Sequence, residues 1–379
     1  MPVVTCIEDL RELSRKRIAR AIFDYVDRGS YAEATLRANR ADLELLTLRQ
    51  RVGIDVDGRS TRGTMLGQQV TMPAALAPIG LCGLNWADGE ILAARAAERF
   101  GVPFTLSTMS ICSIEDVAAA VSKPFWFQLY VMRDRGFAAS LIERAKAAGC
   151  SALVLTLDLQ IQGQRHRDLK NGLAVPPRLT PATFFDVIRK PAWSLNVLRG
   201  RRKSFGNLEG RIPDAKGLTT LSQWIAGQFD PTLSWKDVEW VKRLWGGKLV
   251  LKGILDAQDA KIAAQSGADA IVVSNHGGRQ LDGTSSSIRA LPEIAAAVGE
   301  RLEVWLDGGI RSGQDILRAL ALGARATLIG RAYIYGLGAM GEQGVALALE
   351  LMRRELDVTM ALCGLRDVRE ASPAILRPA

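Results

Sequence analysis

Histidine, cysteine and long apolar runs are all scarce in this 379-residue sequence. Only two histidines are present, and the five cysteines form no C-x-x-C pair, so no disulfide framework is expected and a reducing, cytoplasmic compartment is favoured. No metal site is predicted. Nowhere do about 18 apolar residues run together, and the N-terminus lacks the apolar core of a signal peptide, so we expect no transmembrane segment.

The composition is otherwise typical of a folded globular protein. Hydrophobic residues make up 48% of the sequence and charged residues 23%, which is enough apolar surface for a large core. The length would allow two domains, but barrel folds commonly use roughly 250 residues or more as one unit. We therefore expect a single domain over residues 1–379.

Positive charge exceeds negative charge, giving a formal net charge of +9. Such an excess suits several anionic partners: nucleic acid, a phosphate cofactor, carboxylate substrates or an acidic lipid surface. The charge is unevenly distributed, because the segment 178–211 contains only two acidic residues, Asp186 and Glu209. The basic residues of this segment are Arg178, Arg189, Lys190, Arg199, Arg201, Arg202, Lys203 and Arg211.

Eight short apolar, β-rich runs recur along the chain, each ending in a polar residue or glycine. They lie at 72–77, 102–106, 125–131, 152–157, 248–251, 270–273, 303–306 and 326–329. Amphipathic, alanine-rich stretches typical of helices lie at 88–100, 134–148, 256–266 and 312–322. This alternation predicts a parallel sheet, either a closed (β/α)₈ barrel or an open doubly wound sheet.

Glycines mark a weak internal repeat. Gly149, Gly267 and Gly323 each follow a predicted helix and precede a predicted strand, which is the expected place of a helix C-cap. A much longer stretch separates the fourth strand from the fifth, and we assign an insert to 159–235. We favour an α/β fold of the (β/α)₈ TIM-barrel type, with an N-terminal helical segment and this insert after strand 4, because of where the unusual residues fall.

Polar, ionisable or glycine residues stand at nearly every predicted strand end. In barrels of this kind the chemistry lies at the C-terminal mouth of the strands, built from several strands at once. A purely structural role in the core would not predict this coincidence. The residues are Ala77-Pro78-Ile79-Gly80, Ser107, Gln128 with Tyr130, Thr156 with Asp158, Lys252, Ser274-Asn275-His276, Asp307-Gly308-Gly309 and Gly330-Arg331.

His276 is the predicted base. It precedes Gly277 and Gly278, which let the backbone approach a ligand closely, and Arg279, whose planar fork can bind a carboxylate. An isolated histidine is as often structural as functional, but this loop delivers a base and an anion clamp together. The other histidine, His166, lies in a basic run and is predicted to be a solvated loop residue.

Residues 307–331 predict a phosphate site. Barrels often hold a phosphate after the seventh and eighth strands, using glycine N–H groups and a helix N-terminus, although glycine pairs also form ordinary turns. Lys252 is either a rim lysine with a buried stem or a fixed cation facing the ligand, and its place at a strand end favours the cation. Gln128 and Tyr130 alternate on one strand and therefore share a face.

Four segments together resemble the FMN-dependent 2-hydroxy-acid dehydrogenase and oxidase family. The likeness runs from Phe23-Asp24-Tyr25 through Gly330-Arg331, nearly the whole chain, and is greatest to bacterial members that oxidise L-lactate and reduce quinone. The segment 274–282 (SNHGGRQLD) is highly specific for this family. The four are 127–131 (FQLYV), 251–254 (LKGI), 274–282 (SNHGGRQLD) and 307–311 (DGGIR).

The resemblance implies a role for each candidate residue. His276 would be the base, Asp158 would favour the imidazolium that forms, and Lys252 would face the part of FMN where negative charge appears on reduction. The residues implied to bind substrate are Tyr25, Tyr130, Arg165 and Arg279. The residues implied to hold FMN are Ala77, Pro78, Ile79, Gly80, Ser107, Gln128, Thr156, Lys252, Ser274, Asp307, Gly308, Gly309, Arg311, Gly330 and Arg331.

The implied reaction oxidises L-lactate, or a similar small L-2-hydroxy acid, to the 2-oxo acid. Either a hydride leaves the α-carbon while His276 accepts the hydroxyl proton, or His276 abstracts the α-proton; the sequence favours neither. Met109 stands where plant-type glycolate oxidases tend to have tryptophan, which indicates a substrate with a side chain. Directly after Asp158 the sequence reads Leu159-Gln160-Ile161, where relatives often have proline. This departure makes the position of Arg165 less certain than that of Arg279.

The basic part of the insert interleaves aromatic and leucine residues. This pattern suits an anionic membrane surface, although a solvated loop or a subunit contact would also account for it. The residues concerned are Phe184, Phe185, Trp193, Leu195, Leu198 and Phe205. The resemblance implies quinone as electron acceptor, a peripheral position on the cytoplasmic face of the inner membrane, and a homotetramer.

Three other functions compete with this interpretation. The first is an oxidase of the same family that passes electrons to oxygen and releases hydrogen peroxide. The second is a non-redox barrel, such as an isomerase that binds phosphorylated substrates at 307–331. Nucleic-acid binding is disfavoured, because the basic and aromatic residues form no stacking platform on a known module.

Overall fold

Eight parallel strands form the barrel that the sequence predicts. The computed structural model describes residues 3–173, 180–212 and 217–377. In the sheet the strands follow the order β3-β10-β9-β8-β7-β6-β5-β4, and a parallel bridge between Leu76 and Phe104 joins the two edge strands. The strands are β3 (Ala74–Leu76), β4 (Thr105–Ser107), β5 (Trp126–Leu129), β6 (Ala152–Thr156), β7 (Lys248–Ile254), β8 (Ala270–Val273), β9 (Glu303–Leu306) and β10 (Ala326–Ile329).

Side chains fill the barrel rather than leaving a pore. Trp126 of β5 and Trp305 of β9 stack inside it with ring centroids 5.3 Å apart, and the other inward positions are mostly alanine and valine. A two-stranded hairpin, β1 (Gly63–Met65) and β2 (Gln68–Val70), adds Met65 and Val70 to the same apolar cluster. A filled interior leaves the C-terminal mouth as the place for a ligand.

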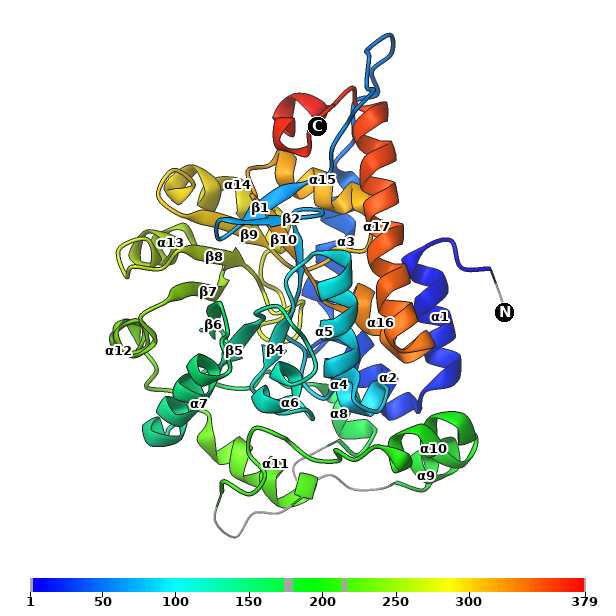
Figure 1. Cartoon of the computed structure of the whole chain (residues 1–379), viewed down its shortest axis with the longest axis vertical. Coiled ribbons are helices and arrows are strands. Elements are labelled where there is room, and N and C mark those ends of the chain that lie inside the picture. Colours follow the sequence, from blue (N-terminus) through cyan, green and yellow to red (C-terminus); the bar gives the residue numbers. More distant parts are fainter. Residues whose placement is uncertain (1–2, 174–179, 213–216, 378–379) are drawn as a thin grey trace.

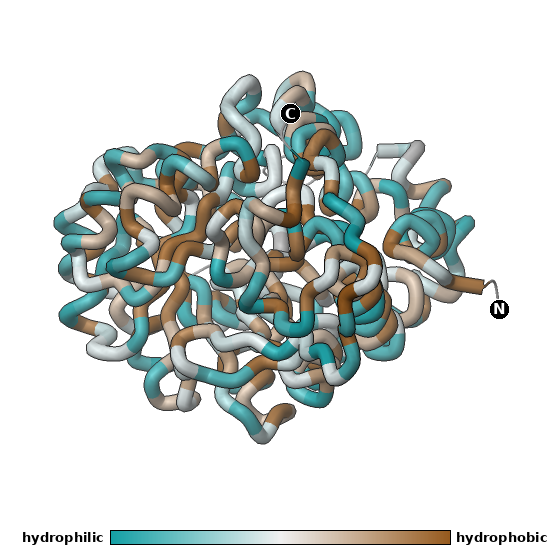
Figure 2. Tube along the Cα trace, turned by 90° about the horizontal axis from the view of Figure 1, so that it is seen from above, coloured by the Kyte–Doolittle hydropathy of each residue, from teal (hydrophilic) through white to brown (hydrophobic). Residues whose placement is uncertain are grey.

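Helices surround the barrel (Figure 1), and hydrophilic residues predominate at the periphery (Figure 2). The helices that accompany the strands are α4 (Cys82–Asn85), α5 (Gly89–Phe100), α6 (Ile114–Ala118), α7 (Arg135–Ala147), α12 (Trp235–Trp245), α13 (Ala257–Ala263), α14 (Ser287–Val298), α15 (Gly313–Ala321), α16 (Arg331–Met340) and α17 (Glu342–Leu362), and two 3₁₀ turns follow, η1 (Val368–Glu370) and η2 (Pro373–Ile375).

The predicted helix boundaries are confirmed with one difference. Gly149, Gly267 and Gly323 all have positive φ, as expected of residues that end helices. The helix predicted over 256–266 ends earlier, at Ala263. Its last residues form tighter turns instead, in which Gln265 N–H donates to Ile262 and Ser266 N–H donates to Ala263.

Two further groups of helices lie outside the repeating pattern. The N-terminal helices are α1 (Ile7–Arg17), α2 (Arg20–Asp27) and α3 (Ala34–Leu45), and the connection between β6 and α12 contains α8 (His166–Lys170), α9 (Pro181–Ile188), α10 (Pro191–Arg199) and α11 (Gly217–Gln228). Figure 1 shows α9, α10 and α11 along one edge of the molecule, where α9 contacts α2 and α10 contacts α4. In the part of the chain that the structure describes, no helix is both long and apolar enough to cross a bilayer.

Helices α16 and α17 touch backbone to backbone at a pair of glycines. A Cβ atom at Gly344 would overlap the carbonyl oxygen of Gly336, and the backbone cannot give way locally. We expect Gly344→Ala to lower the free energy of unfolding by about 2–3 kcal/mol, measured by chemical denaturation. The control is Gly227→Ala on α11, where no atom lies within 4 Å of the added Cβ. Equal denaturation midpoints for the two variants would contradict this packing.

Candidate active site

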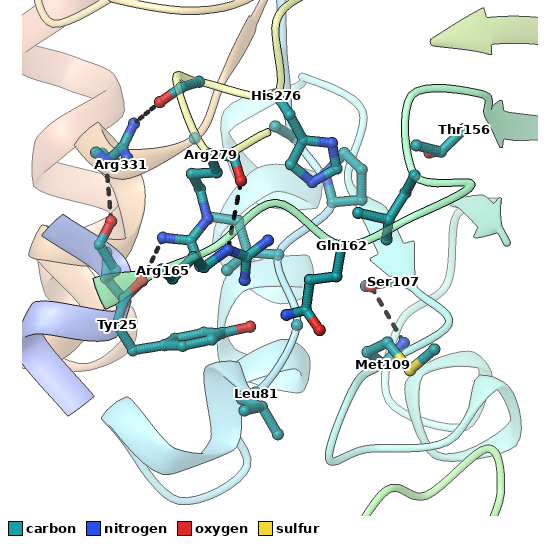
Figure 3. Close-up of a pocket in the computed structure, with 18 of the residues that line it drawn as sticks. Tyr25, Leu81, Ser107, Met109, Thr156, Gln162, Arg165, His276, Arg279 and Arg331 are labelled. Atoms are coloured by element: carbon teal, nitrogen blue, oxygen red, sulfur yellow. Dashed lines mark hydrogen bonds between the residues drawn. The ribbon is translucent and has the colours of Figure 1, made fainter. Parts of the chain in front are cut away.

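A cavity of about 300 Å³ opens at the C-terminal mouth of the barrel. Every residue predicted for the site lines it except Gln128, Asp158 and Ser274, which lie directly behind lining residues. The predicted residues on its wall are Tyr25, Ala77, Pro78, Ile79, Gly80, Ser107, Tyr130, Thr156, Arg165, Lys252, His276, Arg279, Asp307, Gly308, Gly309, Arg311, Gly330 and Arg331. Figure 3 shows His276 and the arginines converging from different segments of the chain.

His276 is held by contacts on both its backbone and its ring. The residue has a left-handed backbone, with φ 57°, and its N–H donates to Ser274 Oγ at 3.0 Å. Its Nδ1 lies 2.8 Å from Asp158 Oδ1. Because a carboxylate can only accept this hydrogen bond, the neutral ring carries its proton on Nδ1, which leaves Nε2 able to take a proton.

Burial and charge act on His276 in opposite directions. Burial lowers the pKa of the imidazole below its ordinary value, the Asp158 carboxylate opposes that shift, and the cations of Lys252 and Arg165 add to it. The net direction is downward, so the ring is neutral near neutral pH. Once the ring takes a proton, Asp158 stabilises the resulting charge.

A glycine in β7 makes room for Asp158. The pairing of β7 with β8 shifts register between Lys252 and Ile254, and Gly253 has φ 101°. A Cβ atom at Gly253 would lie 2.6 Å from Asp158 Cγ. Only glycine allows this approach, so Gly253 is a site residue that the sequence analysis did not single out.

Lys252 links the His276 loop to the end of β9. Its Nζ lies 2.9 Å from Ser274 Oγ and 2.7 Å from Asp307 Oδ2. Burial disfavours the ammonium, but the carboxylates of Asp307 and Asp158 outweigh that effect and raise the pKa of Lys252. The lysine is therefore a cation held on the cavity wall.

Gln128 orients two hydroxyl groups from behind the wall. Its Oε1 accepts from Ser107 Oγ at 3.1 Å, and its Nε2 donates to Thr156 Oγ1 at 3.0 Å. The amide is fully buried and does not line the cavity. Ser107 and Thr156 are thus presented to a ligand in fixed orientations.

Two arginines cap the C-terminal end of α2. Arg279 Nη1 donates to the carbonyls of Tyr25 (2.5 Å) and Arg28 (2.9 Å). Arg331 donates to the carbonyls of Val26 (2.8 Å) and Arg28 (3.0 Å) and also to Gly277 (2.8 Å). The last carbonyls of a helix lack intrahelical partners, so α2 fixes both guanidinium groups beside the cavity.

Arg279 carries its charge in a buried setting. Burial lowers its pKa to about 9, and the neighbouring charge of Arg165 acts in the same direction. The Tyr25 ring lies under the guanidinium, 4.9 Å from Cζ to the ring centroid. Within the described residues, only Nη1 of this guanidinium donates a hydrogen bond, so its other N–H groups are suited to bind an anionic ligand.

Arg165 reaches the cavity although the residues before it depart from the family pattern. It stands at the N-cap of α8, and its Nε donates weakly to the carbonyl of Arg279 at 3.5 Å. His166, one residue further, is exposed as predicted, but it begins α8 rather than lying in a loop. Its ring packs edge-on against Tyr31.

The far end of the cavity has the features of a phosphate site. Helix α16 begins directly after Gly330, and no side chain among the described residues caps its N-terminus, so its first N–H groups are available to an anion. Arg311 and Arg331 both line the cavity, close enough for the charge of Arg311 to act on Arg331. Nearby, Asp307 Oδ1 is buried without a hydrogen-bond partner among the described residues, as expected where a ligand hydroxyl binds. These residues fit a phosphorylated cofactor such as FMN.

The insert contributes an apolar wall that the sequence analysis did not predict. Phe205, Ile225 and Phe229 line the cavity together with Leu159 and Met109. Phe205 was assigned to the membrane-facing pattern, and that assignment is wrong: the residue is 6% exposed and faces the cavity. The alternation of aromatic and basic residues gave no signal for this, because it does not say which aromatics turn inward.

Comparison with known proteins agrees with this geometry. The sequence profile of the family described as FMN-dependent dehydrogenase matches residues 14–378. L-lactate dehydrogenase of Caulobacter vibrioides (strain NA1000 / CB15N) is 49% identical over 375 residues, which covers 99% of this chain and 98% of that protein. L-lactate dehydrogenase of Haemophilus influenzae (strain PittEE) is 47% identical over 375 residues, with the same shares covered.

Solved structures show the same likeness. The monotopic membrane protein (S)-mandelate dehydrogenase superposes with a TM-score of 0.95 at 37% identity, covering 100% of both chains. Mandelate oxidase superposes with a TM-score of 0.83 at 38% identity, covering 99% of this chain and 98% of that one. The similarity therefore includes the barrel, the N-terminal helices and the insert.

Proposed function

The chain belongs to the FMN-dependent dehydrogenase family, and we propose that it oxidises L-lactate to the 2-oxo acid and passes the electrons to respiratory quinone. The observation that carries this proposal is the meeting of the His276–Asp158 pair with the guanidinium groups of Arg279 and Arg165 on one cavity. Oxidation of a 2-hydroxy acid needs a base and a carboxylate clamp. The identity to two lactate dehydrogenases, 49% and 47%, supports lactate as the substrate.

The cavity assigns separate places to cofactor and substrate. FMN, when bound, supplies the acceptor for the electrons that leave the substrate. Ser107, Thr156 and Lys252 would hold its ring system, and Arg311 with the N-terminus of α16 would hold its phosphate. This leaves the arginine side of the cavity for the substrate carboxylate.

The chain's own residues bind the substrate and move its proton. Arg279 and Arg165 bind the carboxylate, while Tyr25 and Tyr130 contact the carboxylate and the hydroxyl group. Burial raises the pKa of Tyr130, so it stays protonated and donates a hydrogen bond. His276 Nε2 takes a proton from the substrate, and Asp158 stabilises the imidazolium.

A pH profile tests the protonation state of His276. The neutral ring is the active form and its pKa is lowered, so kcat/KM should rise with pH along an acidic limb whose midpoint lies below the ordinary histidine value of 6.5. Asp158→Asn should move this acidic limb to still lower pH, because the Asp158 carboxylate raises the pKa of His276. An acidic limb with its midpoint above pH 6.5 would contradict the assignment, and so would a shift of that limb to higher pH in Asp158→Asn.

The exposed surface of the insert supports contact with an anionic membrane. Phe184, Phe185, Ile188, Leu195 and Leu198 are each at least half exposed. The exposed basic side chains close to them are Arg189, Arg199, Arg201 and Lys203. Such a surface binds lipid by apolar burial together with attraction to anionic headgroups. The likeness to (S)-mandelate dehydrogenase, a monotopic membrane protein, points in the same direction.

Some residues that were predicted to belong to this exposed surface instead pack against the rest of the protein. Trp193 donates from its indole nitrogen to the Leu84 carbonyl at 2.9 Å and is only partly exposed. Arg202 pairs with Asp88 and Asp116, each at 2.7 Å, so it serves the fold. Arg178 lies outside the described residues.

A double substitution tests the membrane contact without disturbing the cavity wall. Phe184→Ser with Phe185→Ser should lower binding to vesicles of phosphatidylglycerol and phosphatidylcholine by about tenfold or more, measured by co-sedimentation. The control is Val358→Ser with Leu362→Ser on α17, where both residues are 53% exposed. Unchanged binding in the phenylalanine variant would argue against membrane contact by α9.

Anaerobic bleaching of the bound flavin tests the reaction itself. The yellow holoenzyme should bleach with L-lactate faster than with larger L-hydroxy acids, and D-lactate should have no effect. A protein that none of these acids bleaches would instead favour a non-redox barrel. The homotetramer implied by the family resemblance stays a prediction, which sedimentation of the holoenzyme would check.

The electron acceptor needs a separate experiment. With L-lactate and air, the proposed dehydrogenase should form little hydrogen peroxide and should reduce a soluble quinone analogue. Peroxide formed in step with the 2-oxo acid would decide for an oxidase.

A further inference from the structure

Asp168 on α8 is a buried carboxylate in the cavity wall that no proposed step uses. The residue is 8% exposed and lines the same cavity as His276. Its side chain has no hydrogen bond, and no ion pair within 4 Å, to any described residue. Buried polar groups are normally paired, so an unpaired carboxylate facing a cavity indicates a role toward a ligand.

Charge surrounds Asp168 unevenly. The positive charges of Arg279 and Arg165 stabilise its ionised form, and the negative charge of Asp24 on α2 opposes them. Burial is the largest influence, and the pKa of Asp168 is raised above its ordinary value. The carboxylate is thus close enough to feel both arginines, yet too far to neutralise either by direct contact.

Among the described residues, no carboxylate forms an ion pair with Arg279 or Arg165. The side-chain hydrogen bonds of Arg279 go to backbone carbonyls, and the one side-chain hydrogen bond of Arg165 within that part of the chain goes to the carbonyl of Arg279. Two guanidiniums without an ion-pair partner, side by side on one cavity, would hold a carboxylate very tightly. A tight hold would slow release of a product that keeps the same carboxylate as the substrate.

We propose that Asp168 is a resident counter-charge for Arg279 and Arg165, which weakens their hold on carboxylates so that the 2-oxo acid can leave. The inference rests on the proposed function, because it takes the bound ligand to be a carboxylate. It also predicts that anion affinity rises at low pH, where Asp168 takes up a proton and its negative charge is lost. The groups that face Asp168 in this titration are Arg279, Arg165 and Asp24.

The test titrates oxidised holoenzyme with pyruvate and follows the flavin absorbance. At about pH 7.5, Asp168→Asn should bind pyruvate about tenfold more tightly than wild type, and the difference should shrink toward about pH 5. Protonation of His276 affects both proteins alike, so the ratio of their dissociation constants isolates Asp168. The control is Asp57→Asn, which removes one negative charge at an exposed position and should leave the dissociation constant unchanged.

The outcomes separate this inference from the proposed function. A wild-type protein with no saturable response to pyruvate would overturn the substrate class, and this inference with it. A wild-type response that Asp168→Asn leaves unchanged or weakens would overturn the inference alone.

A second measurement does not depend on the Asp168 variant. In the His276→Gln holoenzyme, where the imidazole is gone, pyruvate binding in acidic solution should take up protons, detected with an indicator dye in weak buffer. Absence of proton uptake there would also overturn the role of Asp168.

Discussion

His276→Gln is expected to lower kcat with L-lactate by about 10²–10⁴-fold while FMN stays bound. The substitution removes the only group on the described cavity wall that combines a lowered pKa with a free ring nitrogen. Glutamine has similar length and polarity but takes no proton near neutral pH. The hydrogen bond from the backbone N–H of residue 276 to Ser274 Oγ does not depend on the side chain at 276, so the loop should keep its conformation.

Stopped-flow bleaching under anaerobic conditions measures this loss directly, and the flavin content of the purified variant shows that the cofactor site is intact. His166→Gln is the matched control, since the other histidine is exposed and lies outside the cavity lining. Wild-type bleaching in the His276 variant would end the assignment of the base.

Arg279→Lys is expected to lower kcat/KM for L-lactate by about 10²-fold, with most of the change in KM. Lysine keeps the positive charge, but it cannot hold the carbonyls of Tyr25 and Arg28 and a carboxylate at once, as the planar guanidinium can. The substrate would lose a two-pronged contact and α2 would lose part of its cap. Charge alone does not replace that geometry.

Steady-state kinetics, together with the dissociation constant for pyruvate, checks this prediction. Arg289→Lys is the control, because its side chain is 72% exposed and its nearest acidic contact is 3.9 Å away. If Arg279→Lys bound pyruvate as well as wild type does, the carboxylate would have to bind elsewhere in the cavity.

The sequence determined the barrel and most of the cavity wall. Eight apolar runs, each ending in polar or glycine residues, predicted the strands, and glycines such as Gly149 and Gly323 marked helix ends correctly. These signals are local: a strand needs a short apolar run, and a helix end needs a residue that tolerates positive φ. Because all parallel strands of a barrel end at one mouth, their terminal residues had to meet there.

Only the tertiary structure decided what lies behind and above that wall. The residues next to Gln128 in the sequence were enough to place it on a strand. Its hydrogen bonds to Ser107 and Thr156, however, depend on how two other strands pack beside it. Glycine is required at position 253 because a Cβ atom there would lie 2.6 Å from Asp158 Cγ.

The N-terminal helices and the insert show the same limit. Nothing in the local sequence near Arg279 or Arg331 indicates that both would cap α2, some 250 to 300 residues earlier in the chain. Likewise, Phe205 faces the cavity while Phe184 and Phe185 face outward, although all three lie in one basic, aromatic segment. Short-range patterns define elements, whereas the direction in which a side chain points from an irregular connection is set by contacts with residues remote in sequence.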